Sequence, residues 1–233
     1  MAKSDLYKIS GHWDHYKDGM FVLGDEEKDK EVFALRPMTC PFQYQAYLNR
    51  KRSYRDLPLR YNETSTLFRN EASGEMHGLI RVRQFTISEG HLMCRPDQLE
   101  DEFKGCLELA IFMLKTLGLY EDVSYRFSMW DPENREKYIG TEEQWDEAQG
   151  AMRRILNHLE IPYVEGVGEA AFYGPKLDIQ IKNVYGKEDT LITIQIDQLL
   201  AEKFGMEYVD SDGQRKNPYI IHRTSIGLSL IHI

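Results

Sequence analysis

Apolar residues recur at helical spacing across residues 97–118, DQLEDEFKGCLELAIFMLKTLG. The pattern predicts a helix with Asp97 as its N-cap, Glu100 as the third residue behind the cap, and Gly118 just after its end. The apolar stripe consists of Leu99, Phe103, Leu107, Ala110, Ile111 and Leu114. A stripe of this kind indicates a helix packed on a core, not a cofactor site.

A second helix is predicted over residues 141–160, TEEQWDEAQGAMRRILNHLE. Thr141 and Gln144 have the spacing of a capping box, in which each side chain bonds to the other's backbone. The inner face of this helix is predicted to carry Trp145, Ala148, Met152, Ile155 and Leu159. These residues should also belong to the core.

Most other ordered segments alternate apolar and polar residues, which is typical of strands. Residues 176–183 (KLDIQIKN) and 191–197 (LITIQID) alternate cleanly and are joined by NVYGKED, which indicates a hairpin. PYIIHR, residues 218–223, is a further short strand. Because strands with short connections and two helices show no regular βαβ alternation, we predict an α+β fold with a largely antiparallel sheet and exclude a Rossmann fold.

A long hairpin is also predicted from residues 64–71 (TSTLFRNE) and 79–91 (LIRVRQFTISEGH), with residues 70–78 as its loop. Alternation would place Arg69 opposite the basic positions of the second strand. One face of that strand would carry Arg81, Arg83, Phe85, Ile87, Glu89 and His91. Such a face is too polar for a core.

Two interpretations of this hairpin remain open. Its arginines could form a clamp for a polyphosphate, since each guanidinium offers a planar fork of donors, and Phe85 could stack on a nucleobase. Alternatively, Glu71, Glu75 and Glu89 could simply pair with the arginines across the strands.

Composition narrows the class of protein. The chain has 233 residues and a formal net charge of −9, which argues against non-specific coating of nucleic acid. Basic residues nevertheless exceed acidic ones from Arg50 to Arg83: Arg50, Lys51, Arg52, Arg55, Arg60, Arg69, Arg81 and Arg83 against Asp56, Glu63, Glu71 and Glu75. A local anion site within an acidic protein is therefore expected.

The chain lacks the features of a membrane or secreted protein. No apolar run approaches the roughly 20 residues of a membrane helix, and no secretory signal is visible at the start. Three cysteines are too few for a disulfide framework. We therefore expect a cytoplasmic protein without a membrane partner.

The segment FRNEASGEMHGLIRVRQF resembles motif 2 of the class II aminoacyl-tRNA synthetases, and further phrases resemble the threonyl-tRNA synthetase family within that class. These phrases are SGHWDHYKDGMF, RPMTCP, RSYRDLPLRY, GEAAFYGPKLDIQ, TIQID and IIHRTSIG, in the family's order from about Ser10 to Gly227. The resemblance implies a class II antiparallel sheet flanked by helices. It also implies ATP-dependent activation of L-threonine to threonyl-adenylate, followed by transfer to tRNA(Thr).

The resemblance assigns roles to the arginine hairpin. Arg69 would hold the α-phosphate of ATP, Arg81 the outer phosphates, Glu71 the adenine amino group, and Phe85 would stack on adenine. Lys176 would assist near the substrates, and Mg²⁺ is expected with the ATP. Chemistry of this kind depends on positioning and charge neutralisation. The loop from Ala72 to Gly78 would contact the acceptor end of the tRNA.

The resemblance also implies one Zn²⁺ bound by Cys40, His91 and His222. Spacing alone does not predict this site, because ligands so far apart form no recognisable metal string, and a histidine such as His222 in an apolar strand is more often a core residue. Three ligands would leave a coordination position for the amino and hydroxyl groups of threonine. Valine, which has no hydroxyl group, would be rejected.

The threonine pocket would be completed by Glu89, Tyr173 and Gln195. This segment departs from the family, whose members commonly have TQDDAH where this chain has TISEGH. Glu89 thus replaces an aspartate and has a longer reach, and Ile87 replaces a glutamine, so the contact expected there is in doubt.

The family pattern is incomplete at both ends of this chain. Motif 1, which builds the dimer interface, should precede it, and the arginine of motif 3 should follow IHRTSIG, where LSLIHI stands and Ile231 occupies the approximate position. We therefore expect residues 1–233 to be a catalytic-core fragment of a homodimeric parent, with little activity alone and with residues 228–233 outside the family pattern. The alternative is a synthetase-like module that binds tRNA or a nucleotide without catalysis.

Overall fold

The structure, a computed structural model, describes residues 1–78 and 81–224. The predictions for the tail at 228–233 and for Ile231 lie outside the described residues. So does the start of the strand predicted from residue 79.

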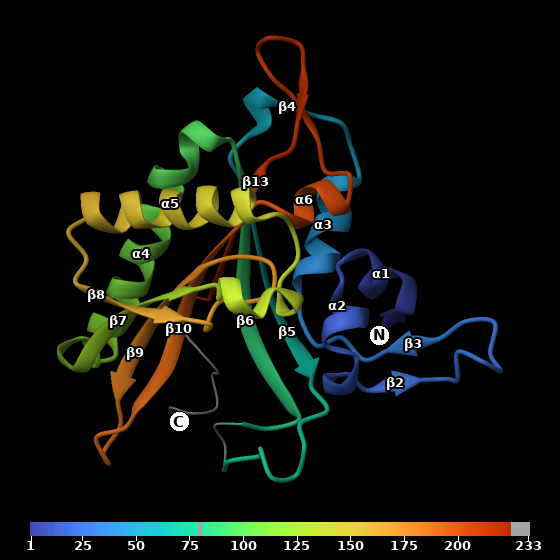
Figure 1. The fold of residues 1–233 in the computed structure, drawn as a ribbon, viewed down its shortest axis with the longest axis horizontal. Coiled ribbons are helices and arrows are strands. Elements are labelled where there is room, and N and C mark those ends of the chain that lie inside the picture. Colours follow the sequence, from blue (N-terminus) through green and yellow to red (C-terminus); the bar gives the residue numbers. More distant parts are fainter. Residues whose placement is uncertain (79–80, 225–233) are drawn as a thin grey trace.

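The described residues contain a main sheet of seven strands in the order β5-β6-β13-β10-β9-β7-β8 (Figure 1). Its strands are β5 (Leu59–Phe68), β6 (Gln84–Cys94), β7 (Val123–Met129), β8 (Tyr163–Val167), β9 (Lys176–Lys182), β10 (Glu188–Asp197) and β13 (Tyr219–Thr224). Neighbours pair antiparallel except β7 and β8, which are parallel. The predicted α+β fold with a largely antiparallel sheet is confirmed.

One face of the sheet is covered by α4 (Leu99–Thr116) and α5 (Glu142–His158), as Figure 1 shows. Apolar residues of both helices pack against the isoleucines of β10 and the inward residues of β9. The predicted capping box is confirmed, since the Thr141 amide donates to Gln144 Oε1 at 2.9 Å and the Gln144 amide donates to Thr141 Oγ1 at 3.3 Å. The alternation read from the sequence thus places one polar face of β9 and β10 away from the helices.

The prediction that Asp97 caps the first helix is wrong. Pro96 begins a single 3₁₀ turn, η3 (Pro96–Gln98), and α4 follows directly at Leu99. Gln98 Oε1 accepts the Arg95 amide at 3.0 Å, while the Asp97 carboxylate binds the Arg95 guanidinium at 2.8–2.9 Å. The proline starts the turn two residues early, so the aspartate pairs with a cation instead of the helix end.

The other face of the sheet carries shorter elements and two smaller cores. They are β1 (Ala2–Lys3), α1 (Ser4–Ile9), α2 (His12–His15), η1 (Lys17–Gly19), β2 (Val22–Leu23), β3 (Phe33–Ala34), α3 (Cys40–Leu48) and α6 (Leu200–Lys203). A separate small sheet consists of β4 (Arg52–Ser53), β11 (Tyr208–Val209) and β12 (Arg215–Lys216), and the remaining 3₁₀ turns are η2 (Tyr54–Asp56), η4 (Tyr120–Asp122) and η5 (Pro132–Lys137). Among the described residues, every helix is too short or too polar to cross a membrane.

The arginine hairpin exists, but its strands differ from the prediction. The first strand begins at Leu59 and ends at Phe68, and the second begins only at Gln84, so Arg81 and Arg83 precede it. Arg81 instead forms an isolated bridge with His77, outside the main sheet. Arg69 does lie opposite a basic residue, since its amide donates to the Arg83 carbonyl at 2.9 Å.

Candidate active site

Three residues from distant parts of the chain converge on one point. Cys40 is the first residue of α3, His91 lies in β6, and His222 lies in β13 directly opposite His91. One ligand atom from each, a thiol sulfur and two ring nitrogens, lies within 4.8 Å of the others. The three side chains are buried, with exposed fractions of 2%, 0% and 4% respectively.

The outer nitrogens of both imidazoles are held by acceptors. His91 Nδ1 lies 3.0 Å from Gln43 Oε1, and the Gln43 amide nitrogen donates to the Glu89 carbonyl at 3.4 Å, which fixes the orientation of the amide. His222 Nε2 lies 3.1 Å from the Asp197 carboxylate. Both outer nitrogens therefore carry the proton, which leaves lone pairs on His91 Nε2 and His222 Nδ1.

These two lone-pair nitrogens face each other at 3.1 Å. Two acceptors at this distance repel unless a cation lies between them. A tetrahedral Zn²⁺ with Zn–N bonds of about 2.0–2.1 Å would hold its nitrogens about 3.3 Å apart, so the spacing fits. The Cys40 sulfur and the two nitrogens supply a ligand set that suits zinc, and carboxylate or amide partners behind each imidazole are typical of metal sites.

Burial sets the protonation of the ligands. Burial, followed by the nearby His222 and Arg223, lowers the pKa of His91 well below its usual value, so the ring is neutral as a ligand must be. Burial, followed by the Glu89 and Asp197 carboxylates, raises the pKa of the Cys40 thiol. The thiol proton must therefore leave when a metal binds.

The metal cluster adjoins a cleft of about 440 Å³ that Cys40, Glu89, Tyr173 and Arg69 all line. Glu89 accepts a hydrogen bond from Thr39 Oγ1 at 2.5 Å, and the Tyr173 ring lies 5.2 Å from the His222 ring. The structure thus brings two of the three predicted threonine contacts, one arginine and one metal ligand into a single cleft.

Gln195 and Lys176 lie behind this cleft on neighbouring strands. Gln195 is opposite both His222 and Lys176 in the sheet, is 5% exposed, and donates to the Gly174 carbonyl at 3.1 Å. The Lys176 ammonium lies 2.6 Å from the buried Asp178 carboxylate. Both residues share the polar face of the sheet with the metal ligands.

The residues expected to bind ATP are adjacent. The Arg69 guanidinium lies over the Phe85 ring at 5.0 Å and donates to the Pro37 carbonyl at 3.3 Å. Arg81 binds Glu71 at 2.8 Å and approaches Glu75 at 3.5 Å. The cross-strand interpretation of the hairpin is only partly represented. Arg81 pairs with Glu71 and Glu75 as that interpretation predicts, but Glu89 bonds to a threonine and not to an arginine.

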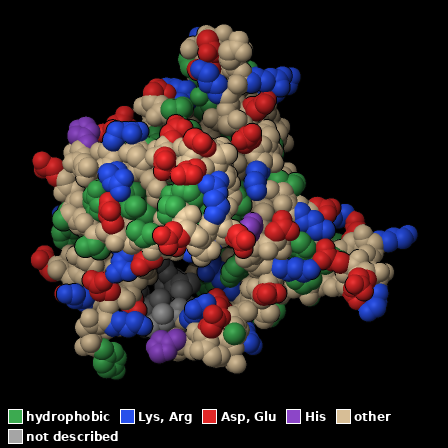
Figure 2. All heavy atoms as spheres, in the orientation of Figure 1, with side chains coloured by type: hydrophobic (Ala, Val, Ile, Leu, Met, Phe, Trp, Pro, Cys, Tyr) green, Lys and Arg blue, Asp and Glu red, His purple; other side chains and the backbone are tan. Residues whose placement is uncertain are grey.

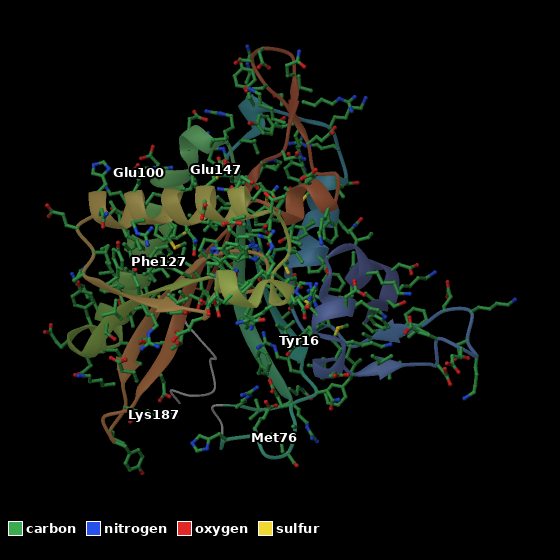
Figure 3. All side chains as sticks on the ribbon, viewed as in Figure 1. Tyr16, Met76, Glu100, Phe127, Glu147 and Lys187 are labelled. Carbon is green, nitrogen blue, oxygen red and sulfur yellow. The ribbon has the colours of Figure 1, made fainter. Side chains whose placement is uncertain are left out.

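Several residues of this site were missed by sequence reasoning. His12, His15, Tyr16 and Lys137 also line the cleft, and Figure 3 shows Tyr16 between the N-terminal elements and β5. His12 is 4% exposed, and burial, followed by its proximity to His222 and Arg69, lowers its pKa to about 3. The sequence feature that could have indicated them is HWDHY, residues 12–16, in which every residue is polar or aromatic. It directly follows Gly11, whose φ of 77° lets the chain turn after α1.

Comparison with known proteins identifies the family of the chain. Residues 21–231 match the model of the tRNA synthetase class II core domain (G, H, P, S and T). A threonine–tRNA ligase of Clostridium perfringens is 70% identical over 227 residues, which are 97% of this chain and 35% of that protein. One from Clostridium botulinum is 71% identical with the same coverage, so the chain spans about a third of the length of these relatives.

Solved structures give the same result. The RNA binding domain of threonyl-tRNA synthetase from Cryptosporidium parvum superposes with a TM-score of 0.88 at 35% identity, covering 97% of this chain and 55% of that one. A threonyl-tRNA synthetase from Aeropyrum pernix, described as putative, superposes with a TM-score of 0.78 at 31% identity, covering 98% and 52%. The resemblance to threonyl-tRNA synthetases is confirmed, and the chain belongs to the family of the tRNA synthetase class II core domain.

Proposed function

We propose that this chain is the catalytic core of a threonine–tRNA ligase. In this function ATP and L-threonine form threonyl-adenylate, and the threonyl group then passes to tRNA(Thr). The observation that carries the proposal is the cluster of Cys40, His91 and His222, whose Cys40 lines the same cleft as Arg69. An amino acid held at the cluster would have its carboxylate directed toward a phosphate held by the arginine.

The activation step requires charge neutralisation more than acid–base chemistry. The threonine carboxylate attacks the α-phosphorus in line, a new acyl–phosphate bond forms, and pyrophosphate leaves. Arg69 neutralises the α-phosphate, Arg81 binds the outer phosphates, and Glu71 and Phe85 bind adenine. Lys176 assists from the neighbouring strand, and Mg²⁺ accompanies the ATP.

Arg81 would exchange partners in this step. Its guanidinium binds Glu71 and Glu75 in the present structure. Nucleotide would replace these contacts, with phosphate at Arg81 and the adenine amino group at Glu71. Breaking these ion pairs would reduce the net free energy of ATP binding, but only slightly, because surface ion pairs are individually weak.

Selection of the amino acid would depend on the metal cluster. Cys40, His91 and His222 would hold Zn²⁺, which would bind threonine through its amino and hydroxyl groups. Glu89 accepts a hydrogen bond from the substrate, and Tyr173 and Gln195 close the pocket. Because valine has nearly the same shape but no hydroxyl, a purely apolar pocket would separate it only weakly.

Further parts of the proposal follow from the family. The loop from Ala72 to Gly78 would contact the acceptor end of tRNA(Thr), the parent protein would be a homodimer, and it would work in the cytoplasm. Lysines and arginines alternate with acidic residues over the visible face in Figure 2, without one large basic field. RNA contact would accordingly be local.

The test is calorimetric titration of the zinc-loaded chain with non-hydrolysable sulfamoyl analogues of threonyl-, seryl- and valyl-adenylate. We expect the threonyl analogue to bind most tightly, the seryl analogue about 10–200-fold more weakly, and the valyl analogue at least about 1,000-fold more weakly. Valyl binding within tenfold of threonyl binding would contradict the assigned pocket.

The alternative function, a module that binds RNA or a nucleotide without catalysis, is less well supported. The proteins at 70–71% identity carry the name of a ligase. The same titration separates the two, since a module without an amino-acid pocket should not distinguish the three analogues.

A further inference from the structure

The turn between β9 and β10 exposes two apolar side chains almost completely. Val184 is 94% exposed and Tyr185 is 92% exposed, the highest values for large apolar residues in the described part of the chain. A tyrosine in this position contributes nothing to the core. Exposed aromatic residues of this kind are more typical of a contact surface.

The turn is held in one conformation by Asn183. Asn183 Oδ1 accepts the amides of Tyr185 at 2.9 Å and of Lys187 at 3.1 Å, and its backbone nitrogen donates to the Lys187 carbonyl at 2.8 Å. Gly186 takes the positive φ of 76° that closes the turn. The tyrosine is therefore presented on a rigid support, which reduces the entropy lost on binding.

The charge of this turn is locally positive. Lys182 and Lys187 flank it, are both exposed, and have no ion-pair partner within 4.0 Å in residues 1–78 and 81–224. The acidic residues next to them are already engaged: Glu188 accepts from Ser124 at 2.9 Å and lies 3.6 Å from Arg126, and Asp189 accepts from Asn183 at 2.9 Å.

The turn projects from the same end of the sheet as the arginine loop. β6 and β10 are both antiparallel to β13, so they run in the same direction, and their first residues lie at the same end. Thr224 of β13 lies opposite Glu89 of β6 on one side and beside Thr193 of β10 on the other. β6 begins five residues before Glu89 and β10 begins five residues before Thr193, so the two strands begin at about the same height in the sheet. Figure 3 shows Met76 and Lys187 at the same edge of the molecule.

The lateral spacing allows one ligand to reach both segments. β6 and β10 are two strands apart, and β5 and β9 are four strands apart. At about 4.8 Å per strand these separations are about 10 Å and 20 Å. An RNA that contacts the loop of residues 72–78 can therefore also contact the turn.

We propose that the β9–β10 turn is a second RNA contact, in which Tyr185 stacks on an unpaired base and Lys182 and Lys187 contact phosphates. This inference rests on the proposed function, which supplies an RNA at this end of the sheet. Stacking on a rigid aromatic ring tolerates any base, and two unpaired lysines beside the ring provide charge complementarity to the phosphates.

The test is fluorescence anisotropy with a labelled acceptor-stem hairpin of tRNA(Thr) that keeps its single-stranded 3′ end. Tyr185→Ala should weaken binding about fivefold or more, and Tyr185→Phe should bind like the parent chain because it keeps the ring. Lys182→Gln with Lys187→Gln should lower the slope of log affinity against log salt by about 1.4–1.8, as expected for two lost phosphate contacts.

Controls for the same kinds of side chain lie on α4, which packs on the apolar face of the sheet. Phe112→Ala removes an aromatic ring that is 63% exposed, and Lys104→Gln with Lys115→Gln removes the same charge as the turn variant. Phe112→Ala should not change RNA affinity by more than about twofold. The double lysine control should do the same once the general weakening caused by the lower net charge of the protein is subtracted.

The outcomes separate the two proposals. Binding that is unaffected by the turn variants, or weakened equally by the α4 controls, would overturn the inference while leaving the proposed function intact. Absence of hairpin binding by the parent chain itself would contradict both the inference and the tRNA part of the proposed function.

Discussion

The two halves of the proposed site, one for a metal and one for phosphates, are built differently. The metal half is formed by buried side chains on adjacent strands and a helix start, and each imidazole is fixed by a partner of its own. The phosphate half is formed at the base of a loop, where Arg81 is 49% exposed and its guanidinium is occupied by glutamates. In the proposed function the first half would bind its ligand without rearrangement, whereas the second would have to exchange partners.

This difference indicates where each half obtains its selectivity. A rigid, buried cluster discriminates by what fits its coordination positions, since nothing around it can move to accommodate a wrong ligand. A half-buried Arg69 and an exposed Arg81 respond mainly to charge and can bind any polyphosphate of the right length. We therefore expect amino-acid selection in the metal half and nucleotide binding in the phosphate half, with little coupling between them.

The strongest way to break the comparison is Cys40→Ser. Loss of one ligand of three should weaken zinc binding by about 1,000-fold or more and abolish the preference for threonyl over valyl analogue. Binding of a non-hydrolysable ATP analogue should stay within about twofold, because Cys40 lies in the other half. Zinc affinity is measured by competition with a chelator, and undiminished zinc binding would show that the ligand set is wrong.

Arg69→Gln tests the phosphate half alone. Loss of a charged hydrogen-bond donor should weaken binding of the ATP analogue by about 10–100-fold, while zinc content stays at its parent value. Titration calorimetry gives the first quantity and metal analysis the second. A fall in zinc content would mean that the two halves are not independent.

Asp197→Asn tests whether the outer partners prepare the metal half. Asp197 accepts from His222 with one oxygen and from the Leu199 and Leu200 amides with the other, and an amide has only one oxygen to offer. Zinc affinity should fall about 10–100-fold.

Asp178→Asn is the matched control for that measurement. Asp178 is 2% exposed on the same face of the sheet but bonds to Lys176, Ser128 and Thr193. Its substitution should leave zinc affinity within about twofold of the parent. Equal losses in both variants would point to general destabilisation, not to preparation of His222.

Glu75→Gln should have the smallest effect. The Arg81–Glu75 separation is 3.5 Å and Glu75 is half exposed, so the pair contributes no more than about 1 kcal/mol. Its loss should leave Arg81 slightly freer and tighten binding of the ATP analogue by less than about fivefold. Weaker nucleotide binding in this variant would argue that Glu75 orders the loop instead of competing for Arg81.

The fold was largely predictable because its signals are local. The capping box at Thr141 and the alternation of residues 191–197 each depend on a few consecutive residues, and both are confirmed. The prediction that Asp97 caps the helix was wrong because the adjacent Pro96 shifted the start of the turn. The prediction that the second hairpin strand includes Arg81 was wrong, because alternation of residues does not reveal where the hydrogen bonding between the two strands stops.

The site was less predictable because its geometry is long-range. His91 and His222 are 131 residues apart in the chain, and only the register of β6 with β13 makes them neighbours. Gln43 and Asp197 have no sequence pattern that links them to those histidines. The resemblance to a family supplied the candidate metal ligands, but not the residues that would orient them, nor His12, His15 and Tyr16 in the cleft.

X-ray absorption at the zinc edge of the zinc-loaded chain is the most direct test of the metal half. We predict one zinc per chain, with one sulfur at about 2.3 Å and two imidazole nitrogens at about 2.0–2.1 Å, the remaining position being filled by a light atom. The sulfur contribution should vanish in Cys40→Ser. A zinc spectrum without sulfur, or with two or more sulfurs, would contradict the central claim that Cys40, His91 and His222 form the metal site.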